Sequence, residues 1–336
     1  MAFHSGFVCI LGRPNVGKST LLNALVGEKL AIISPKPQTT RNRILGIIEV
    51  PAKNQRPGAQ VVLIDTPGVH KPDSSLGRKM MVEVREAMEG CDLVLLMTDV
   101  TQKLDRKDEF ALQMARDAGT PVFLLLNKID LIPQKDQLLP MIDQLRQLQD
   151  FREVIPLSAR KGQGLDILLS AVVRNLPKGP RYFPEGQLTD QPVRFMVSEI
   201  IREQVLLETR QELPYATAVV VEQFEEKKTL TRIAAILYCE RDAQKRILIG
   251  KQGQMLKKIG TAARVQIERM VGTKVFLELF VKVMPGWRES KTFVEETDWR
   301  RQLEQMTGMG TATRGENALG RDLASAAKAV DFDEEL

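Results

Sequence analysis

The sequence predicts a doubly wound α/β domain with a mostly parallel sheet, followed by a smaller α+β domain. Three observations support this prediction. Apolar runs alternate with helical patterns through the first half of the chain, prolines and glycines gather just after residue 176, and the order of helices and strands changes beyond them. The chain has 336 residues, of which 43% are hydrophobic, and this is enough for two domains with separate cores.

The first half contains six apolar runs that are typical of strands. They lie at residues 7–11, 44–50, 61–64, 93–97, 122–126 and 154–157. Helical patterns are expected at residues 19–26, 78–88, 107–118, 135–149 and 165–174. Strands that are apolar along their whole length indicate a sheet covered on both faces, as in doubly wound α/β folds.

A proline- and glycine-rich stretch predicts a linker between the two domains. Beyond it we expect a helix at 193–209, strands at 216–223 and 231–239, helices on both sides of 250–253, and a strand at 275–283. The predicted domains are therefore 1–176 and 193–285, joined by the linker 177–192. A tail follows at 286–336, and we expect it to be partly helical or disordered.

Several classes of protein are excluded. No apolar run reaches the ~20 residues needed to cross a bilayer, and the N-terminus leads into the first strand without the pattern of a signal peptide. Cys9, Cys91 and Cys239 each stand alone in apolar runs, so we expect reduced, buried thiols and a cytoplasmic protein.

A phosphate-binding loop is predicted directly after the first strand. The segment GRPNVGKS fits the pattern G-x-x-x-x-G-K-[ST], and a helix is expected to follow it. In such a loop, backbone N–H groups and the helix N-terminus face phosphate, and the lysine neutralises the β and γ phosphates. The candidate nucleotide-binding residues here are Gly12, Arg13, Pro14, Asn15, Val16, Gly17, Lys18 and Ser19.

The third strand ends in a second nucleotide motif, DTPGV, which gives the candidate residues Asp65, Thr66, Pro67, Gly68 and Val69. Gly68 would sense the γ phosphate through its backbone N–H. Magnesium would be held by Ser19, by Asp65, and by Thr40 of the loop before the second strand. In Ras-type enzymes a glutamine follows this glycine and orients the attacking water. Val69 cannot do so, which leaves two alternatives: the chain binds nucleotide without hydrolysing it, or another group replaces the glutamine.

The sequence Asn127-Lys128-Ile129-Asp130 follows the fifth strand and identifies the base. A carboxylate accepts two hydrogen bonds from N1–H and the 2-amino group of guanine, whereas adenine would leave it unpaired at a cost of ~1–3 kcal/mol or more. We expect Asp130 to take this role. Asn127 would tie the segment to the phosphate loop, Lys128 would cover a face of the base, and Ser158-Ala159 would meet guanine O6.

The second domain carries a candidate nucleic-acid clamp. Residues 241–264 contain seven Lys or Arg and one Asp, although the net charge of the whole chain is only +5. A G-x-x-G turn between two helices is the backbone clamp of KH domains. The candidate RNA-binding residues are Lys245, Arg246, Gly250, Lys251, Gln252, Gly253, Lys257 and Lys258. The alternative is a solvated basic face.

These motifs resemble those of the Era family of GTPases, in particular GRPNVGKSTLLNAL, QTTR and DTPGVHKP, and the resemblance covers residues 5 to about 285. It implies an α/β P-loop GTPase domain followed by a type II KH domain. It also implies slow, magnesium-dependent hydrolysis of GTP to GDP, binding near the 3′ end of small-subunit (16S) rRNA, and assistance in 30S ribosomal subunit biogenesis.

Further expectations concern catalysis and partners. The resemblance implies that Asn15 helps to hold a potassium ion against the phosphates, and that catalysis also depends on Lys18, Thr40 and Gly68. It implies a peripheral contact with the inner face of the cell membrane, although the sequence contains no amphipathic anchor, and we expect a monomer. The alternative function is an RNA-binding module in which GTP is a structural or slow switch ligand.

Overall fold

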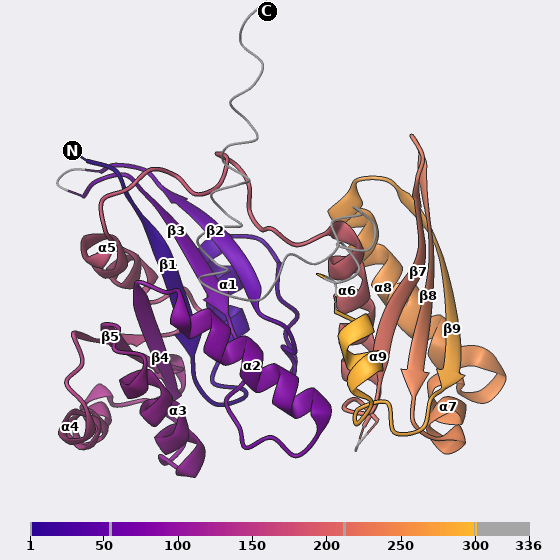
Figure 1. Ribbon diagram of the computed structural model, residues 1–336, viewed down its shortest axis with the longest axis horizontal. Helices are drawn as coiled ribbons and strands as arrows, with labels where there is room; N and C mark the ends of the chain where they lie inside the picture. The colour runs from indigo at the N-terminus through magenta and orange to yellow at the C-terminus, as the bar shows by residue number, and fades with distance from the viewer. Residues whose placement is uncertain (1, 54–55, 211–212, 299, 301–336) are drawn as a thin grey trace, which may run out of the picture.

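The computed structural model describes residues 2–53, 56–210, 213–298 and 300. It contains two lobes, each built on its own sheet (Figure 1). The first sheet has the strand order β2-β3-β1-β4-β5-β6, and its strands are parallel except for β2, which runs antiparallel to β3. The predicted fold class is confirmed. The strands are β1 (His4–Leu11), β2 (Ile44–Val50), β3 (Ala59–Asp65), β4 (Leu93–Asp99), β5 (Val122–Asn127) and β6 (Glu153–Leu157).

Both faces of this sheet are buried. Phe7, Cys9 and Leu11 belong to a core on one face, and Val8 and Ile10 belong to a core on the other. This alternation explains why β1 is apolar along its length, since successive side chains of a strand point to opposite faces. The covering helices are α1 (Lys18–Val26), α2 (Ser75–Glu89), α3 (Arg106–Asp117), α4 (Leu138–Leu148) and α5 (Leu165–Asn175).

Two predicted helix starts in the first lobe differ from the structure by more than one residue. The helix α2 begins at Ser75 rather than at residue 78, because the Ser74 Oγ accepts a hydrogen bond from the backbone N–H of Gly77 at 3.0 Å and caps the helix N-terminus. The helix predicted to start at residue 135 instead begins with one 3₁₀ turn (Lys135–Gln137), and α4 follows from Leu138.

The segment 177–192, predicted as a linker, is attached to the first lobe. The side chain of Gln60 on β3 accepts hydrogen bonds from the backbone N–H groups of Tyr182 and Phe183, and donates one to the Phe183 carbonyl. The Phe183 side chain is buried in the core of that lobe. Residues 182 and 183 are therefore fixed to the first lobe through β3.

The second lobe places three helices on one side of a three-stranded sheet with the order β7-β8-β9. The strands β7 and β8 are antiparallel, whereas β8 and β9 are parallel. Its core includes Ile201, Leu237, Ile259 and Ile267, which are buried. The elements are α6 (Val193–Glu208), β7 (Ala218–Glu226), β8 (Leu230–Cys239), α7 (Asp242–Ile249), α8 (Gln254–Val271) and β9 (Lys274–Val283).

The chain after β9 returns to the space between the lobes, where α9 (Lys291–Glu296) lies (Figure 1). A cluster of buried side chains joins the lobes there, and we call it the junction core; it consists of Leu76, Met80, Ala218, Trp287, Phe293 and Val294. Within the predicted tail 286–336, residue 299 and residues 301–336 lie outside the described residues. No described helix is long and apolar enough to cross a membrane.

Replacing Trp287 tests how much the junction core contributes to stability. The indole is 1% exposed and donates a hydrogen bond to the Ala216 carbonyl at 2.9 Å. We expect Trp287→Ala to lower the free energy of unfolding by about 3–5 kcal/mol, because it opens a cavity and leaves that carbonyl unpaired. Urea unfolding measures this change.

Val82→Ala on the exposed side of α2 is the matched control. The Val82 side chain is 46% exposed, so its truncation should change stability by no more than about 0.5 kcal/mol. Equal, small losses for the two variants would show that the junction core does not hold the lobes together.

Candidate functional site

The phosphate loop lies between β1 and α1, at the carboxyl edge of the first sheet. The Lys18 ammonium is buried and donates hydrogen bonds to the carbonyls of Gly12 at 2.9 Å and Arg13 at 3.0 Å. Burial lowers the pKa of Lys18 to about 8, and the nearby Asp65 carboxylate opposes this shift. This geometry fixes a cation at the interior of the loop, as binding of a phosphate requires.

A cluster of oxygens lies beside this lysine. The Ser19 Oγ donates to the Asp65 Oδ2 at 2.6 Å, and it lies 2.8 Å from the Thr40 Oγ1. Thr40 also donates to Asp65 Oδ2, at 3.3 Å, whereas the neighbouring Thr39 Oγ1 donates to the Lys36 carbonyl. Thr40, rather than Thr39, therefore faces the predicted magnesium ligands.

The chemistry of this cluster fits magnesium. Asp65 is fully buried, and its Oδ1 has no hydrogen-bond partner among the described residues. Burial raises the pKa of Asp65 to about 6, against the charge of Lys18 and the hydrogen bonds from Ser19 and Thr40. A buried carboxylate with an unpaired oxygen, next to two hydroxyl groups, is a donor set that a hard dication satisfies.

The DTPGV segment packs directly on the phosphate loop. A Cβ on Gly68 would lie 2.7 Å from the Pro14 Cα, so only glycine fits at this approach. The backbone N–H of Val69 donates to the Gly12 carbonyl at 3.1 Å, and the Val69 side chain is fully buried in the core. Thr66 donates to the Ile10 carbonyl at 2.7 Å. Val69 thus helps to fix the two loops together through its main chain.

The predicted base-binding residues lie at the end of β5. The Asn127 side-chain amide donates to the Val16 carbonyl at 2.7 Å and accepts from the Ala159 N–H at 3.0 Å. Asn127 therefore joins the phosphate loop to the segment after β6. The sequence predicted its contact with the phosphate loop but not the one with Ala159. The Lys128 ammonium donates to Asp99 at 2.6 Å, and Asp130 lies in the adjacent one-turn 3₁₀ helix.

A cavity of about 670 Å³ joins the phosphate end to the base end. This volume lies within the usual range for small-ligand sites. The predicted residues that line it are Pro14, Asn15, Gly17, Lys18, Ser19, Thr40, Gly68, Asn127, Lys128, Asp130 and Ser158. The predicted residues that do not are Gly12, Arg13, Val16, Asp65, Thr66, Pro67, Val69 and Ala159, which lie behind the lining.

Sequence reasoning missed several residues of this cavity. Gln102 and Arg160 come from loops that carry no recognised nucleotide motif, so no sequence signal marked them. The loop before β2 contributes more than its threonine, because it folds over the opening of the cavity. Its further lining residues are Ile32, Ile33, Ser34, Pro35, Gln38 and Thr39.

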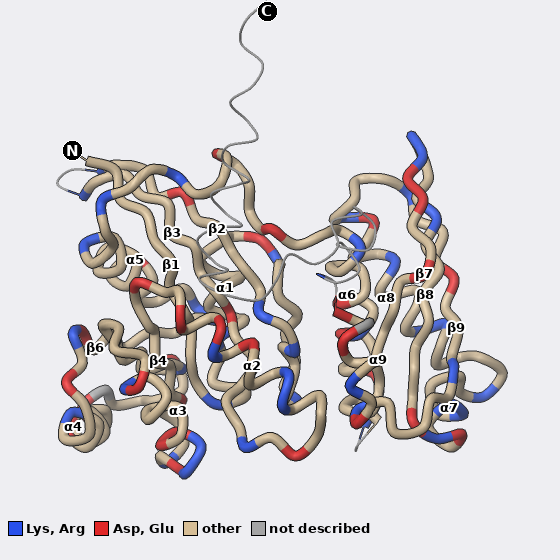
Figure 2. The backbone as a smooth tube through the Cα atoms, in the orientation of Figure 1, with Lys and Arg blue, Asp and Glu red and all other residues tan. Residues whose placement is uncertain are grey.

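The G-x-x-G turn of the second lobe separates α7 from α8. Gly250, Gln252 and Gly253 have φ angles of 74°, 49° and 77°. Glycine adopts positive φ without strain, whereas Gln252 holds a conformation that is uncommon for a residue with a side chain. Of the predicted cations, Arg246, Lys251, Lys257 and Lys258 are exposed and Lys245 is half-buried; Figure 2 shows basic residues on both helices. Lys258 forms an ion pair with Glu208 at 2.5 Å.

A groove of about 300 Å³ runs from this turn along α8 to β9. Gly260 keeps the helix close to the strand, since a Cβ there would lie 3.2 Å from the Leu279 side chain. Sequence reasoning included Gly253 and Lys257 but missed Arg264, which also lines the groove. The remaining lining residues are Leu256, Gly260, Thr261, Leu277 and Leu279. An apolar floor with a basic rim can accept unpaired bases beside a clamped backbone.

Comparison with known proteins agrees with both the nucleotide cavity of the first lobe and the G-x-x-G turn of the second. A family model described as 50S ribosome-binding GTPase matches residues 7–128, and a KH domain model matches residues 212–288. The protein named GTPase Era from Geobacter metallireducens is 50% identical over 296 residues, which are 88% of this chain and 97% of the relative. The chain belongs to the GTPase Era family.

Another relative extends the family resemblance along the chain. GTPase Era from Ruminiclostridium cellulolyticum is 47% identical over 301 residues, which are 89% of this chain and 99% of the relative. A match of that length extends past residue 285, so the range of 5 to about 285 predicted for the Era resemblance was too short. The junction core agrees with this result, because residues 287–294 pack against both lobes.

Two solved Era structures have the same fold. Aquifex aeolicus Era bound to GDP and AlF₄⁻ has a TM-score of 0.84 and 39% identity, covering 88% of this chain and 99% of that chain. Era in complex with MgGDPNP and nucleotides 1506–1542 of 16S ribosomal RNA has a TM-score of 0.84 and 38% identity, with the same coverage.

Asp65→Asn tests the magnesium site through its electrostatics. The pKa of Asp65 in the folded chain is about 6, above its ordinary value of 3.8. Ionisation therefore opposes folding, and this penalty is absent below about pH 4 and complete above about pH 6. We expect the nucleotide-free variant at about pH 8, with metal chelated, to be more stable than wild type by on the order of 3 kcal/mol.

The same variant should lose magnesium-dependent GTP turnover, because asparagine brings no charge to the oxygen cluster. Thermal unfolding at about pH 8 and pH 4, with parallel turnover assays, measures the two effects. A stability gain that is equal at both pH values would contradict the assigned ionisation, and undiminished turnover would contradict the metal site.

Proposed function

We propose that this Era family GTPase binds GTP with magnesium, hydrolyses it, and binds small-subunit 16S rRNA near its 3′ end through its KH domain, assisting 30S subunit assembly. The observation that carries this proposal is the presence in one chain of a nucleotide cavity and a basic clamp, in two lobes that the loop containing Thr40 connects. The relative solved with MgGDPNP and a 16S rRNA fragment supports the same combination.

Each end of the cavity has a defined role in this proposal. Lys18 and the phosphate-loop N–H groups bind the β and γ phosphates, and Asp130 accepts the two hydrogen bonds that guanine offers. Ser19, Thr40 and Asp65 hold magnesium, which supplies positive charge at the phosphates when it is bound. Thr40 reaches this position only when its loop lies against Ser19 and Asp65. The conformation of the loop can therefore depend on whether the γ phosphate is present.

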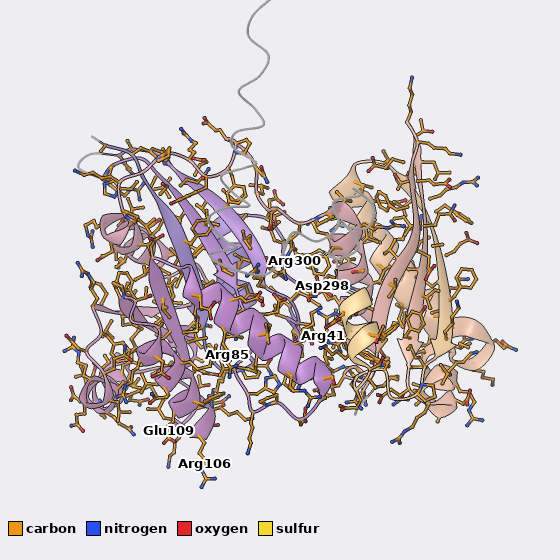
Figure 3. The ribbon with its side chains drawn as sticks, viewed as in Figure 1. Arg41, Arg85, Arg106, Glu109, Asp298 and Arg300 are labelled. Atoms are coloured by element: carbon orange, nitrogen blue, oxygen red, sulfur yellow. The ribbon has the colours of Figure 1, made fainter. Side chains whose placement is uncertain are left out.

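The Thr40 loop also contacts the second lobe, which allows nucleotide to influence RNA binding. The Arg41 guanidinium donates to the carbonyls of Thr217 at 2.8 Å and Tyr215 at 3.1 Å, and lies over the ring of Trp287. Figure 3 shows Arg41 between the two lobes. A change in the Thr40 loop therefore moves groups that touch the KH domain. This arrangement supports a switch rather than two independent binding sites.

The second candidate function is an RNA-binding module in which GTP is a structural ligand. The burial of Val69 favours it, because this side chain cannot orient a water. Turnover measured with and without a 16S rRNA 3′ fragment, in potassium and in sodium, separates the two candidates. Nucleotide binding without hydrolysis under all four conditions would exclude the enzyme.

Gly253→Asp tests the RNA clamp. Nothing lies within 4 Å of a Cβ built at Gly253, so the side chain fits and projects its charge into open space. We expect at least about tenfold weaker binding of the 16S rRNA 3′ fragment, because a carboxylate beside phosphate is repelled. Gly253→Asn is the matched control, since it has the same shape, tolerates the left-handed backbone and carries no charge. Equal affinities for the two variants would exclude a phosphate contact.

Asn15→Ala tests the proposed potassium site. The Asn15 amide nitrogen donates to the Pro35 carbonyl at 2.8 Å, and its oxygen takes no part in that bond. This oxygen could bind a cation beside the phosphates, where positive charge stabilises the transition state. We expect wild type to turn over GTP about tenfold faster in potassium than in sodium, and the variant to lose that difference. A potassium effect that survives in Asn15→Ala would refute this role.

Two further parts of the proposal concern the cellular setting. Peripheral contact with the inner face of the cell membrane follows from the family resemblance, and the monomeric state follows from our sequence analysis. Both stay predictions, as does the choice of the 30S subunit as the assembly partner.

A further inference from the structure

A buried carboxylate stands next to the base-binding loop, although no nucleotide motif includes it. Asp99 ends β4 and is paired in register with Asn127 on β5. Its side chain is 1% exposed. The Oδ1 accepts hydrogen bonds from the backbone N–H of Thr101 at 3.0 Å and from its hydroxyl at 2.6 Å. Thr101 therefore fixes the Asp99 carboxylate independently of the base-binding loop.

The other oxygen of Asp99 holds Lys128. The Lys128 Nζ donates to Asp99 Oδ2 at 2.6 Å, and the lysine backbone has a φ of 72°, an unfavourable left-handed conformation for a residue with a side chain. Burial raises the pKa of Asp99, but hydrogen bonds from Lys128 and Thr101 outweigh it and lower the pKa overall. The ion pair thus fixes the end of a flexible side chain that lines the cavity.

The same carboxylate connects to the phosphate loop through Gln102. The Gln102 amide donates to Asp99 Oδ2 at 3.3 Å and accepts from the Arg13 guanidinium at 2.7 Å. Arg13 is 6% exposed. Its other terminal guanidinium nitrogen, Nη1, lies 3.2 Å from a carboxylate oxygen of Asp105 and 3.2 Å from one of Asp108, at the N-terminus of α3. A continuous series of polar contacts thus runs from the phosphate loop to Lys128. We call these residues the bracing network: Arg13, Gln102, Asp99 and Lys128.

We propose that Asp99 and Arg13 are positioning residues for guanine: Asp99 holds the Lys128 side chain against the base, and Arg13 ties that arrangement to the phosphate loop. Neither side chain needs to touch the nucleotide. This inference rests on the proposed guanine-nucleotide function of the cavity. It predicts that the network acts on the base and only weakly on the phosphates.

Asp99→Asn tests the first link. The variant keeps the size of the side chain and removes the charge that holds Lys128. We expect GDP affinity to fall about tenfold, as for the loss of a charge-assisted hydrogen bond, through faster GDP dissociation. The kcat at saturating GTP should change less than about twofold, since the phosphates are untouched. Binding of magnesium tripolyphosphate, which lacks a base, should not change.

A double-mutant cycle shows whether Asp99 acts through Lys128. We expect Lys128→Met to weaken GDP binding by a similar factor, and the double variant to be no weaker than Lys128→Met alone. Arg13→Gln should weaken GDP binding about threefold in wild type, as for the loss of part of a hydrogen-bond network, and should have no effect on a Lys128→Met background. Multiplicative losses would overturn the proposal.

Two further variants separate positioning from general stability. Glu240→Gln removes a partly buried carboxylate from an ion pair with Arg288 in the second lobe, and it should leave GDP affinity unchanged. Thr101→Val leaves the Asp99 charge in place but removes its 2.6 Å hydrogen bond, and should weaken GDP binding about threefold through Lys128. It provides the test if Asp99→Asn does not fold.

The outcomes distinguish this inference from the proposed function. Failure of the wild-type chain to bind GDP would overturn the function. Tight GDP binding by wild type and by a folded Asp99→Asn variant alike would overturn only the positioning role. An equal loss of GDP and tripolyphosphate binding would also overturn it, because the defect would then lie in the phosphate loop or in the fold.

Discussion

The arrangement of this GTPase depends on two adjacent residues that face opposite ways. Thr40 lies against Ser19 and Asp65 in the proposed magnesium site, whereas the next residue, Arg41, is buried against carbonyls of the second lobe. Burial, assisted by the charge of Arg202, lowers the pKa of Arg41 to about 9 despite the nearby Glu199. Removing Arg41 from this pocket would leave several carbonyls unpaired, so the loop cannot leave the metal site without disturbing the junction between the lobes.

Neighbouring contacts strengthen this link. Glu203 on α6 pairs with Lys29 at 2.5 Å and accepts from the Ile33 N–H at 3.0 Å, just before the Thr40 loop. On the other side, Glu83 of α2 binds Arg300 at 2.8 and 3.0 Å. Both chain segments that follow nucleotide-binding motifs are thus attached to residues beyond the first domain. The first domain is thus linked to α6 on one side and to Arg300, beyond β9, on the other.

The sequence was sufficient to predict the fold and most of the cavity, because those features are encoded locally. A strand, a glycine loop and a helix place Lys18 correctly, and the end of β5 brings Asn127 to the phosphate loop. The contacts between the lobes could not be predicted this way. Arg41 and Thr217 are far apart in the chain, and no motif or spacing pairs them. Gln102 lies in a loop whose sequence marks no function. Such positions depend on how the folded helices and strands pack against one another, and the spacing of residues in the sequence does not determine that packing.

The position of Val69 shows why a Ras-type glutamine does not fit at this residue of the chain. Its side chain is fully buried among apolar groups, so a glutamine there would place an unpaired amide in the core or force the segment outward. Moving outward would break the 3.1 Å bond from the Val69 N–H to the Gly12 carbonyl, and with it the close contact between Gly68 and Pro14. The close packing of Gly68 on Pro14 therefore leaves no place for a water-orienting side chain at residue 69. Under the proposed hydrolytic function, the attacking water must be oriented by another group, and the Thr40 loop, which lines the cavity, is our candidate.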